Sequence, residues 1–284
     1  MKINLTQNKN FKLFKIISKV AQENNQTVYI VGGYVRDLLM QRKAPTDIDF
    51  VTEQSGIELA KAVGKELGDL KVSVFKTYGT AMIKYKDLDL EFVGARKESY
   101  SEDSRKPAVE TGTLEDDQKR RDFTVNALAI SLNAENFGEL IDPFNGREDM
   151  QNKILRTPLE PAQTYSDDPL RMMRAIRFAS VLHFEIEKNS LEAIKQEAER
   201  IKIVSMERIM VEFNKIMLSE KPSVGLKLME ETTLLEKIIP ELTALRGIEE
   251  VEGQTHKDNF WHTLEVVDNI SKNTDNLWLR WAAL

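Results

Sequence analysis

The 284-residue sequence contains no cysteine, only 13 glycines and 8 prolines, and no apolar run near the ~20 residues that a membrane-spanning helix needs. The lack of cysteine excludes thiol catalysis, a thiolate zinc site and a disulfide scaffold, and makes the reducing cytoplasm the expected compartment. With 41% hydrophobic and 30% charged residues, the composition is that of a folded soluble protein rather than a disordered or collagen-like chain. The polar N-terminus argues against a signal peptide, so we expect neither export nor a membrane.

The sequence also has fewer positively than negatively charged residues. The chain carries 40 Lys and Arg against 46 Asp and Glu, a net charge of −6. This balance argues against a protein that coats nucleic acid by bulk charge, but it is compatible with a local basic groove. Contact with RNA is therefore expected from short rows such as Arg171, Arg174 and Arg177.

Hydrophobic patterning divides the chain into an α+β first half and an all-helical second half. Strands alternate with helical stretches over the first ~90 residues, which predicts a small mixed β-sheet with flanking helices. Strands are expected at 28–31, 48–51, 72–75, 80–85, 88–93 and 127–132. A cluster of turn formers at 142–146 marks the boundary. Helices are expected beyond it, at 168–181, 189–200, 205–219, 223–238 and 260–271.

The strongest chemical feature begins with two glycines, Gly32 and Gly33, directly after the apolar strand at 28–31. Two glycines allow a tight turn and a close approach of the backbone to a ligand. The short helix that follows offers free N–H groups to a phosphate. Arg36 lies one helical turn further on and is expected to add a charge-assisted contact.

The second part of this feature is Asp47-Ile48-Asp49, which follows Gly33 with thirteen residues between them. Residues two apart in a strand share a face, so both carboxylates are available to a pair of divalent ions. Mg²⁺ takes few protein carboxylates and completes its shell with water and phosphates. Glu91, in the strand at 88–93, is the natural third carboxylate. Singly, these features read as an ordinary turn, a solvated strand end and an exposed strand position; together they favour a two-metal site.

The segments GGYVRDLL and APTDIDFVT resemble the nucleotidyltransferase signature of the DNA polymerase β superfamily. The rest of the chain narrows this resemblance to class II tRNA nucleotidyltransferases and bacterial poly(A) polymerases, with motifs from about residue 28 to 215. The resemblance implies a catalytic head domain over 1–150, a base-selecting helical neck over 151–220, and a helical body over 221–284. This last region looks like the start of an HD-type domain, which we expect to be truncated at Leu284, and we expect His262 there to be exposed and without metal.

The segment KRRDFTVNALA, residues 119–129, looks like the family's second motif, which holds the ribose and triphosphate of the incoming nucleotide. In a helix starting near Thr124, Asn126 would lie close to Asp122, so that a carboxylate and an amide together grip a ribose. Arg121 adds charge for phosphates. The alternative is a capped helix start with Asp122 as the N-cap. Residues 141–149 are similar to the family's hinge motif between head and neck.

The segment DPLRMMRAIRF, residues 168–178, looks like the motif that selects the base. Asp168 and Arg171 are neighbours on one face of a helix with Pro169 at its first position. A carboxylate accepts from an exocyclic amine and a guanidinium donates to ring nitrogen or carbonyl oxygen, so the pair can read the edge of C or A. Arg174 and Arg177 continue the row toward phosphates. Spacing alone favours an ordinary helix start with a basic face, and it is the resemblance that favours base selection.

The segment SMERI with Glu212 is similar to the family's last motif, a helix start that buttresses the base-selecting helix, although a Ser-capped amphipathic helix fits as well. The resemblance implies an enzyme that adds C, C and A to the 3′ end of tRNA from CTP and ATP, with Mg²⁺ at Asp47 and Asp49 and with Glu91 completing the site. A poly(A) polymerase, which uses ATP alone, is the nearest alternative. Residues 75–81 look like the CCA-adding form. A split enzyme that adds only CC or only A, and a non-catalytic RNA-binding module, are further alternatives.

Overall fold

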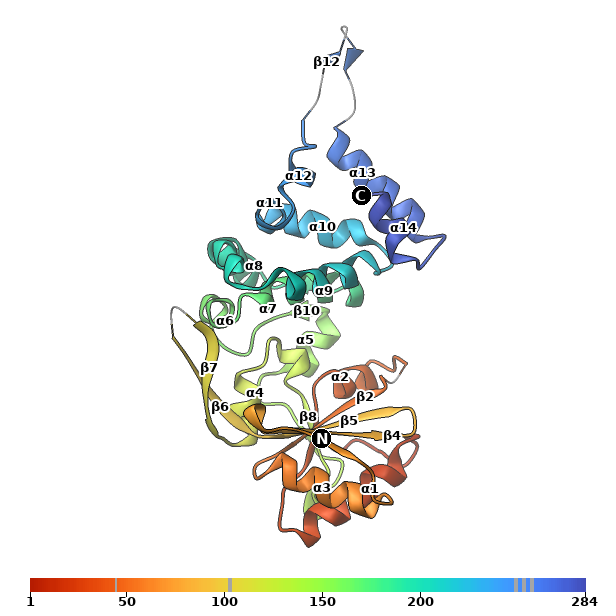
Figure 1. Cartoon of the computed structure of the whole chain (residues 1–284), viewed down its shortest axis with the longest axis vertical. Coiled ribbons are helices and arrows are strands. Elements are labelled where there is room, and N and C mark those ends of the chain that lie inside the picture. The colour runs from red at the N-terminus through yellow and green to blue at the C-terminus, as the bar shows by residue number, and fades with distance from the viewer. Residues whose placement is uncertain (44, 102–103, 248–249, 252–253, 256–257) are drawn as a thin grey trace. The chain divides into compact units, whose positions relative to one another are not determined.

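The computed structural model describes residues 1–43, 45–101, 104–247, 250–251, 254–255 and 258–284. The chain forms two compact units (Figure 1), of which the first comprises Met1–Tyr100 with Lys106–Gln151 and the second Ser101–Arg105 with Asn152–Leu284. Over the described part of the chain, none of the helices combines the length and the apolar character needed to span a membrane.

A seven-stranded mixed sheet is the centre of the first unit. Its strand order is β3-β4-β5-β2-β1-β8-β9, in which β2 pairs with β5 in parallel and the other neighbours are antiparallel. The strands are β1 (Tyr29–Val31), β2 (Asp47–Thr52), β3 (Val72–Phe75), β4 (Thr80–Tyr85), β5 (Leu88–Gly94), β8 (Ala129–Ser131) and β9 (Leu140–Ile141). All six strands expected from the sequence are therefore present, and the predicted α+β class is confirmed.

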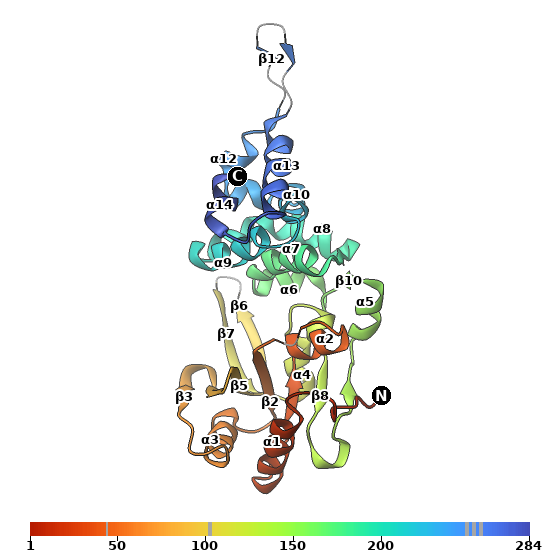
Figure 2. The same ribbon diagram turned by 90° about the vertical axis from the view of Figure 1, so that its right-hand side faces the viewer.

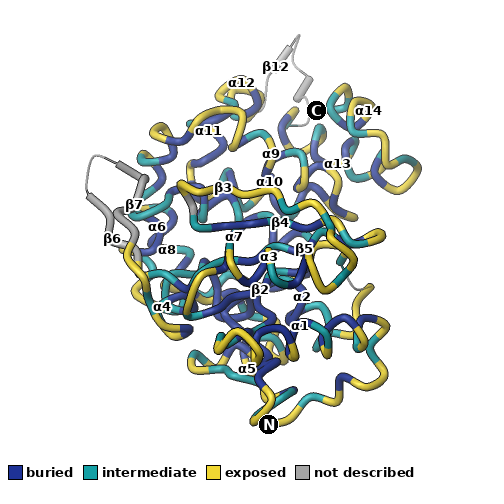
Figure 3. The backbone as a smooth tube through the Cα atoms, turned by 60° about the horizontal axis from the view of Figure 1, so that its bottom comes forward, coloured by how far each residue is buried: buried dark blue, intermediate teal, exposed yellow. Residues whose placement is uncertain are grey.

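The two faces of this sheet are covered differently (Figure 1). Helices α1 (Phe11–Glu23) and α3 (Gly56–Glu66) lie on one face, where they enclose the main core with alternate strand residues such as Ile48 and Phe50. The opposite face carries α4 (Leu114–Lys119), whose Leu114 belongs to a smaller cluster that includes Val51, whereas the buried Tyr34 and Val35 of α2 (Gly33–Leu39) belong to the main core. Figure 3 shows the central strands buried and β3 exposed at the edge. Because Asp49 alternates with Phe50, its carboxylate leaves the sheet on the less apolar face.

The sequence did not predict several elements between the sheet strands. These are the hairpin strands β6 (Arg96–Ser101) and β7 (Ser104–Thr111), helix α4, the 3₁₀ turns η1 (Lys76–Tyr78), η2 (Thr124–Asn126) and η3 (Ala134–Asn136), and α5 (Gly146–Asn152). Segments this short or this polar give no periodic apolar signal. The expected helix near Thr124 is a single 3₁₀ turn, which is a correction to the sequence-based prediction.

The second unit is helical and, in its described part, also contains two short strand pairs. Its helices are α6 (Pro161–Asp167), α7 (Leu170–Leu182), α8 (Lys188–Glu197), η4 (Ala198–Ile203), α9 (Met206–Met217), α10 (Pro222–Glu231), α11 (Leu234–Ile238), α12 (Pro240–Thr243), α13 (Asn259–Ser271) and α14 (Leu277–Ala282). Its strands are β10 (Ile154–Leu155), β11 (Glu185–Ile186), β12 (Glu250–Val251) and β13 (Gln254–Thr255). Helix α7 packs against α9 and α10, and α6 packs against α8 (Figure 2).

One helix of this unit differs from the prediction. The sequence pattern indicates a continuous helix over 223–238, but the structure divides it into α10 and α11 at Thr232 and Thr233. The Thr232 hydroxyl donates to the Leu228 carbonyl, and Thr233 adopts a left-handed conformation with φ of 61°. Threonine hydroxyls compete with the helical backbone for hydrogen bonds, which explains the break. His262, on α13, is exposed as expected.

Candidate active site

The two-glycine turn joins β1 to α2. Gly32 has φ of 73° and ψ of −141°, a conformation that favours glycine. Space is restricted there too, because a Cβ atom on Gly32 would lie 3.0 Å from Nη1 of Arg121 and 3.4 Å from Oδ2 of Asp49. The turn therefore brings backbone, a guanidinium and a carboxylate within one small volume.

The candidate metal-binding carboxylates lie on adjacent strands. Asp49 of β2 is in register with Val31 of β1 on one side and with Glu91 of β5 on the other. Burial raises the pKa of the Asp49 carboxyl; Arg121 opposes this shift, and the negative charge of Asp47 adds to it. Burial and the charge of Asp49 likewise raise the pKa of Glu91. These carboxylates destabilise one another's ionised forms, and a bound cation would relieve that repulsion.

The donor set suits a hard divalent cation such as Mg²⁺, which prefers carboxylate oxygens and keeps several ligands from water and phosphates. Within the described residues, however, no three His, Asp or Glu side chains are grouped so as to hold a metal ion by themselves. The expected third carboxylate, Glu91, thus lies opposite Asp49 in the sheet. Together with Asp47 and Asp49 it does not form a ready-made group of three metal ligands. Asp89, opposite Asp47, pairs with Lys84 at 3.0 Å instead.

The expected proximity of Asp122 and Asn126 is confirmed. Nδ2 of Asn126 donates to Oδ1 of Asp122 at 2.9 Å, and both side chains are buried. Helix α5 supports this turn, since the Thr124 hydroxyl donates to Asp149 at 2.7 Å. A Cβ atom on Gly146, in the segment that resembles the hinge motif, would collide with the Thr124 carbonyl oxygen. The amide and carboxylate are therefore held in a fixed relation to each other.

Arg36, from which a phosphate contact is expected, is bonded to neighbouring protein groups. Only 8% of the residue is exposed, and its guanidinium is bonded to Asp37 through Nε and Nη2 and to Oδ1 of Asn126 through Nη1, at 2.7 Å. The expectation was a direct phosphate contact. That contact stays a prediction, and in the structure Arg36 orients the Asn126 amide, whose oxygen accepts from Arg36 while its nitrogen donates to Asp122.

A residue that the sequence did not single out, Asp117, holds Arg121. Both Nε and Nη2 of Arg121 donate to Oδ2 of Asp117, at 3.0 and 2.8 Å. The spacing of Asp117 from Arg120 and Arg121, three and four residues apart in a helix, is the signal that could have identified it. Residues 114–119 are too few and too polar to predict a helix from apolar periodicity, so the sequence does not reveal this spacing as a contact.

In the second unit, Asp168 and Arg174 line an open hollow of about 300 Å³ together with Arg208 and Glu212. Arg171 is held at the start of α7, where Nη1 donates to the Thr164 carbonyl at 3.3 Å and the backbone N–H donates to the Asp168 carbonyl. Pro169 precedes the first helical residue rather than occupying it. The first contact holds the guanidinium of Arg171, and the second fixes the backbone between Asp168 and Arg171.

Arg177 does not continue an exposed basic row. Its side chain is 13% exposed, its Nε lies 2.5 Å from Oε2 of Glu212, and its guanidinium is 3.9 Å from the centre of the Phe178 ring. Glu212 belongs to α9, which packs on α7. The expected packing of α9 against the helix that carries the base-selecting motif is therefore present. Arg177 takes part in it through Glu212, and a phosphate contact of Arg177 stays a prediction.

Comparison with known proteins places these residues in context. A family model described as the poly A polymerase head domain matches residues 28–156, and a model described as a probable RNA and SrmB binding site of polymerase A matches residues 183–245. The A-adding tRNA nucleotidyltransferase of Aquifex aeolicus is 36% identical over 84% of the chain and 28% of its own length. The CCA-adding enzyme of Anoxybacillus flavithermus is 35% identical over 83% of the chain and 57% of its own length. The chain thus spans about half or less of these curated relatives.

Solved structures are similar over nearly the whole chain. A tRNA nucleotidyltransferase in complex with a primer tRNA and an incoming ATP analogue matches with a TM-score of 0.74 and 31% identity, over 94% of this chain and 74% of that one. The Thermotoga maritima CCA-adding enzyme in complex with tRNA matches with a TM-score of 0.78 and 27% identity, over 99% and 63%. The chain therefore belongs to the family of tRNA nucleotidyltransferases and poly(A) polymerases.

Proposed function

We propose that this chain adds nucleotides to the 3′ end of tRNA, taking CTP and ATP and releasing pyrophosphate. The observation that carries the proposal is the placement of Asp49 beside both the Gly32 turn and Glu91, because nucleotidyl transfer requires carboxylates for cations next to a phosphate-binding turn. The relatives described as acting on tRNA support the choice of acceptor.

Each group of residues has a role in this proposal. Asp47 and Asp49 would hold Mg²⁺, and Glu91 would orient the attacking hydroxyl or complete the site. When bound, the metal supplies activation of the primer 3′-hydroxyl and neutralisation of charge on the triphosphate. The backbone at Gly32 and Gly33 would lie against the phosphates, with Arg121 as their cation.

The ribose and the base would be held by side chains. Besides the hydrogen bond that joins them, the Asn126 amide carries a second N–H and the Asp122 carboxylate a second oxygen, so this pair would offer both a donor and an acceptor to a ribose hydroxyl. Asp168 would accept from the exocyclic amine of C or A, while Arg171 donates to the ring nitrogen or carbonyl. A uracil or guanine edge would leave one of these groups unpaired, which costs about 1–3 kcal/mol. Arg174, which lines the hollow with Asp168, would add positive charge.

Replacing Arg171 by Ala is expected to blur base selection. The variant loses the donor that pairs with C or A but not the carboxylates of the first unit, so incorporation of UTP and GTP relative to CTP and ATP should rise about tenfold or more. The measurement is kcat/KM for each nucleotide. Arg246→Ala is the matched control, because Arg246 pairs with Glu230 at an exposed position away from the hollow. A uniform fall in rate with unchanged selectivity would contradict the assigned role of Arg171.

A second candidate, addition of the terminal A alone, is favoured by the similarity to the A-adding enzyme of Aquifex aeolicus. Labelled nucleotides, supplied singly and in pairs with a tRNA that lacks its last three nucleotides and with one that lacks only the terminal A, separate the possibilities. Addition of C, C and then A, stopping after three nucleotides, is the result we expect. Extension of only the second tRNA would indicate an A-adding enzyme, and an ATP-only ladder would indicate a poly(A) polymerase.

A further inference from the structure

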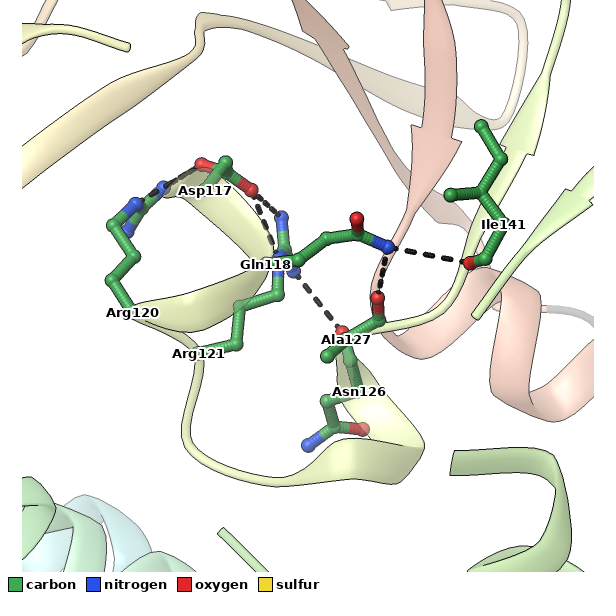
Figure 4. Close-up of polar contacts among 7 residues, drawn as sticks. All are labelled: Asp117, Gln118, Arg120, Arg121, Asn126, Ala127 and Ile141. Carbon is green, nitrogen blue, oxygen red and sulfur yellow. Dashed lines mark hydrogen bonds and ion pairs between the residues drawn. The ribbon is translucent and has the colours of Figure 1, made fainter. Parts of the chain in front are cut away.

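Asp117 is a fully enclosed carboxylate at the centre of a polar cluster in the first unit (Figure 4). Its two oxygens face different arginines. Oδ1 accepts from Nε of Arg120 at 3.0 Å and also from Nη2 of the same residue, and Oδ2 accepts from both Nε and Nη2 of Arg121. One buried carboxylate thereby fixes two successive guanidinium groups.

The helix that carries Asp117 is itself anchored to the sheet. Nε2 of Gln118 donates to the carbonyls of Ala127, at 2.6 Å, and Ile141, at 3.3 Å (Figure 4). Thr113 and Asp116 form a capping box at the start of α4. The hydrogen bonds of Gln118 and the cap of α4 thus fix the helix, and with it the position of Asp117, in addition to the ion pairs of Asp117 itself.

These bonds leave Nη1 of Arg121 beside the candidate phosphate-binding turn. Nη1 lies 3.4 Å from the Asn126 carbonyl oxygen and 3.0 Å from the point that a Cβ atom on Gly32 would occupy. Burial disfavours the cation, but the charges of Asp117 and Asp49 outweigh burial and raise the pKa of Arg121. Arg121 therefore presents a permanent positive charge in one orientation.

Burial also opposes ionisation of Asp117, but attraction to Arg121 and Arg120 prevails and lowers the pKa of this carboxyl. A buried ion pair is seldom worth more to stability than an apolar pair of similar size. The ion pairs of Asp117 with Arg120 and Arg121 therefore account better for a fixed orientation of the guanidinium groups than for stability.

We propose that Asp117 is a positioning residue for nucleotide binding. It holds the guanidinium of Arg121 so that Nη1 stands over the Gly32 turn before the triphosphate arrives. Preorganisation of this kind lowers the cost of ordering a side chain during binding. The inference rests on the proposed function, in that the ligand at the turn is a nucleoside triphosphate.

The test compares Asp117→Asn with wild type by calorimetric titration with ATP and CTP in the presence of Mg²⁺. We expect the Kd for both nucleotides to rise about tenfold, and KM in the tRNA assay to rise with a smaller change in kcat. Glu115→Gln is the matched control, since it removes the same charge from the same helix at an exposed pair with Lys119. The control should bind as wild type does.

Repeating the change in an Arg121→Ala background separates positioning from a general structural effect. If Asp117 acts through Arg121, Asp117→Asn adds no further loss of affinity in that background. An equal loss in both backgrounds, or no loss in the wild-type background, overturns the inference. Should Asp117→Asn fail to fold, Arg121→Lys keeps the charge but loses the paired contact, and unchanged affinity in that variant would overturn the inference as well.

The same titrations distinguish this inference from the proposed function. Wild-type protein that binds neither ATP nor CTP would overturn both. Wild-type protein that binds nucleotides equally well with Asn at position 117 would overturn the role of Asp117 alone. Nucleotide binding that depends on Asp117, without transfer to tRNA, would support the positioning role and overturn the proposed reaction.

Discussion

Replacing Asp49 by Ala is expected to reduce nucleotide incorporation below about one per cent of the wild-type rate. Loss of a residue that only supports a metal ligand costs about 10–100-fold, so loss of a direct ligand should cost more. The fold should survive, because burial and the neighbouring carboxylates already raise the pKa of Asp49 and its ionised form is a source of repulsion. The measurement is single-turnover transfer of labelled nucleotide to tRNA, alongside thermal unfolding.

Asp89→Asn is the matched control for this change. Asp89 lies opposite Asp47 in the parallel pair of β2 and β5, but its carboxylate is paired with Lys84. Asp89→Asn removes one negative charge from the same sheet, as Asp49→Ala does. If Asp49 acts as a metal ligand and not through bulk charge, the rate of Asp89→Asn should stay within about threefold of wild type. Residual turnover of a few per cent in Asp49→Ala would contradict the two-metal assignment.

The largest expected effect on stability comes from Arg280 in α14, which is 1% exposed. Its guanidinium donates to the carbonyl of Met217 at the end of α9, to that of Ser219 just after it, to that of Ser271 at the end of α13, and to that of Thr274. Helix C-terminal carbonyls lack intrahelical donors and carry partial negative charge. Arg280→Met should therefore lower the free energy of unfolding of the second unit by about 3 kcal/mol or more, since several buried acceptors lose their donor.

Urea unfolding followed by tryptophan fluorescence measures this effect selectively. The three tryptophans, Trp261, Trp278 and Trp281, all belong to the second unit. Arg246→Met serves as the comparison, because Arg246 is about half exposed and should contribute less than about 1 kcal/mol. An unchanged unfolding midpoint in Arg280→Met would show that the acceptors find other donors.

Much of the first unit could be predicted because each strand carries its own signal. The alternation of Ile48 and Phe50 with Asp47 and Asp49 was enough to place the carboxylates on one face, away from the main core. The closeness of Asn126 to Asp122 was likewise predictable, since it depends on a separation of four residues along one short turn. Local spacing therefore identified contacts between residues near in sequence.

The partners of the arginines could not be predicted, because they depend on contacts between elements far apart in the chain. Arg36 is 90 residues from Asn126, and Arg177 reaches Glu212 on another helix. A sequence pattern shows that an arginine is present but not which carboxylate or amide neutralises it. Arg36 and Arg177 were therefore expected to face phosphates, whereas the structure engages both with protein groups.

The division of the helical part into a neck over 151–220 and a body over 221–284 stays a prediction. The roles of the site residues and the identity of the metal are likewise predictions. The chain spans 28% and 57% of the length of the Aquifex and Anoxybacillus relatives, and its activity is a proposal.

The most direct test of the central claim is the stoichiometry of the reaction itself. Wild-type protein would be incubated with Mg²⁺, a tRNA lacking its last three nucleotides, CTP and ATP, and both labelled tRNA and released pyrophosphate would be counted. The account predicts one pyrophosphate for each nucleotide joined to the tRNA 3′ end, and no transfer when Mg²⁺ is chelated. Undiminished transfer in the chelator, or nucleotide hydrolysis without extension of the tRNA, would contradict it.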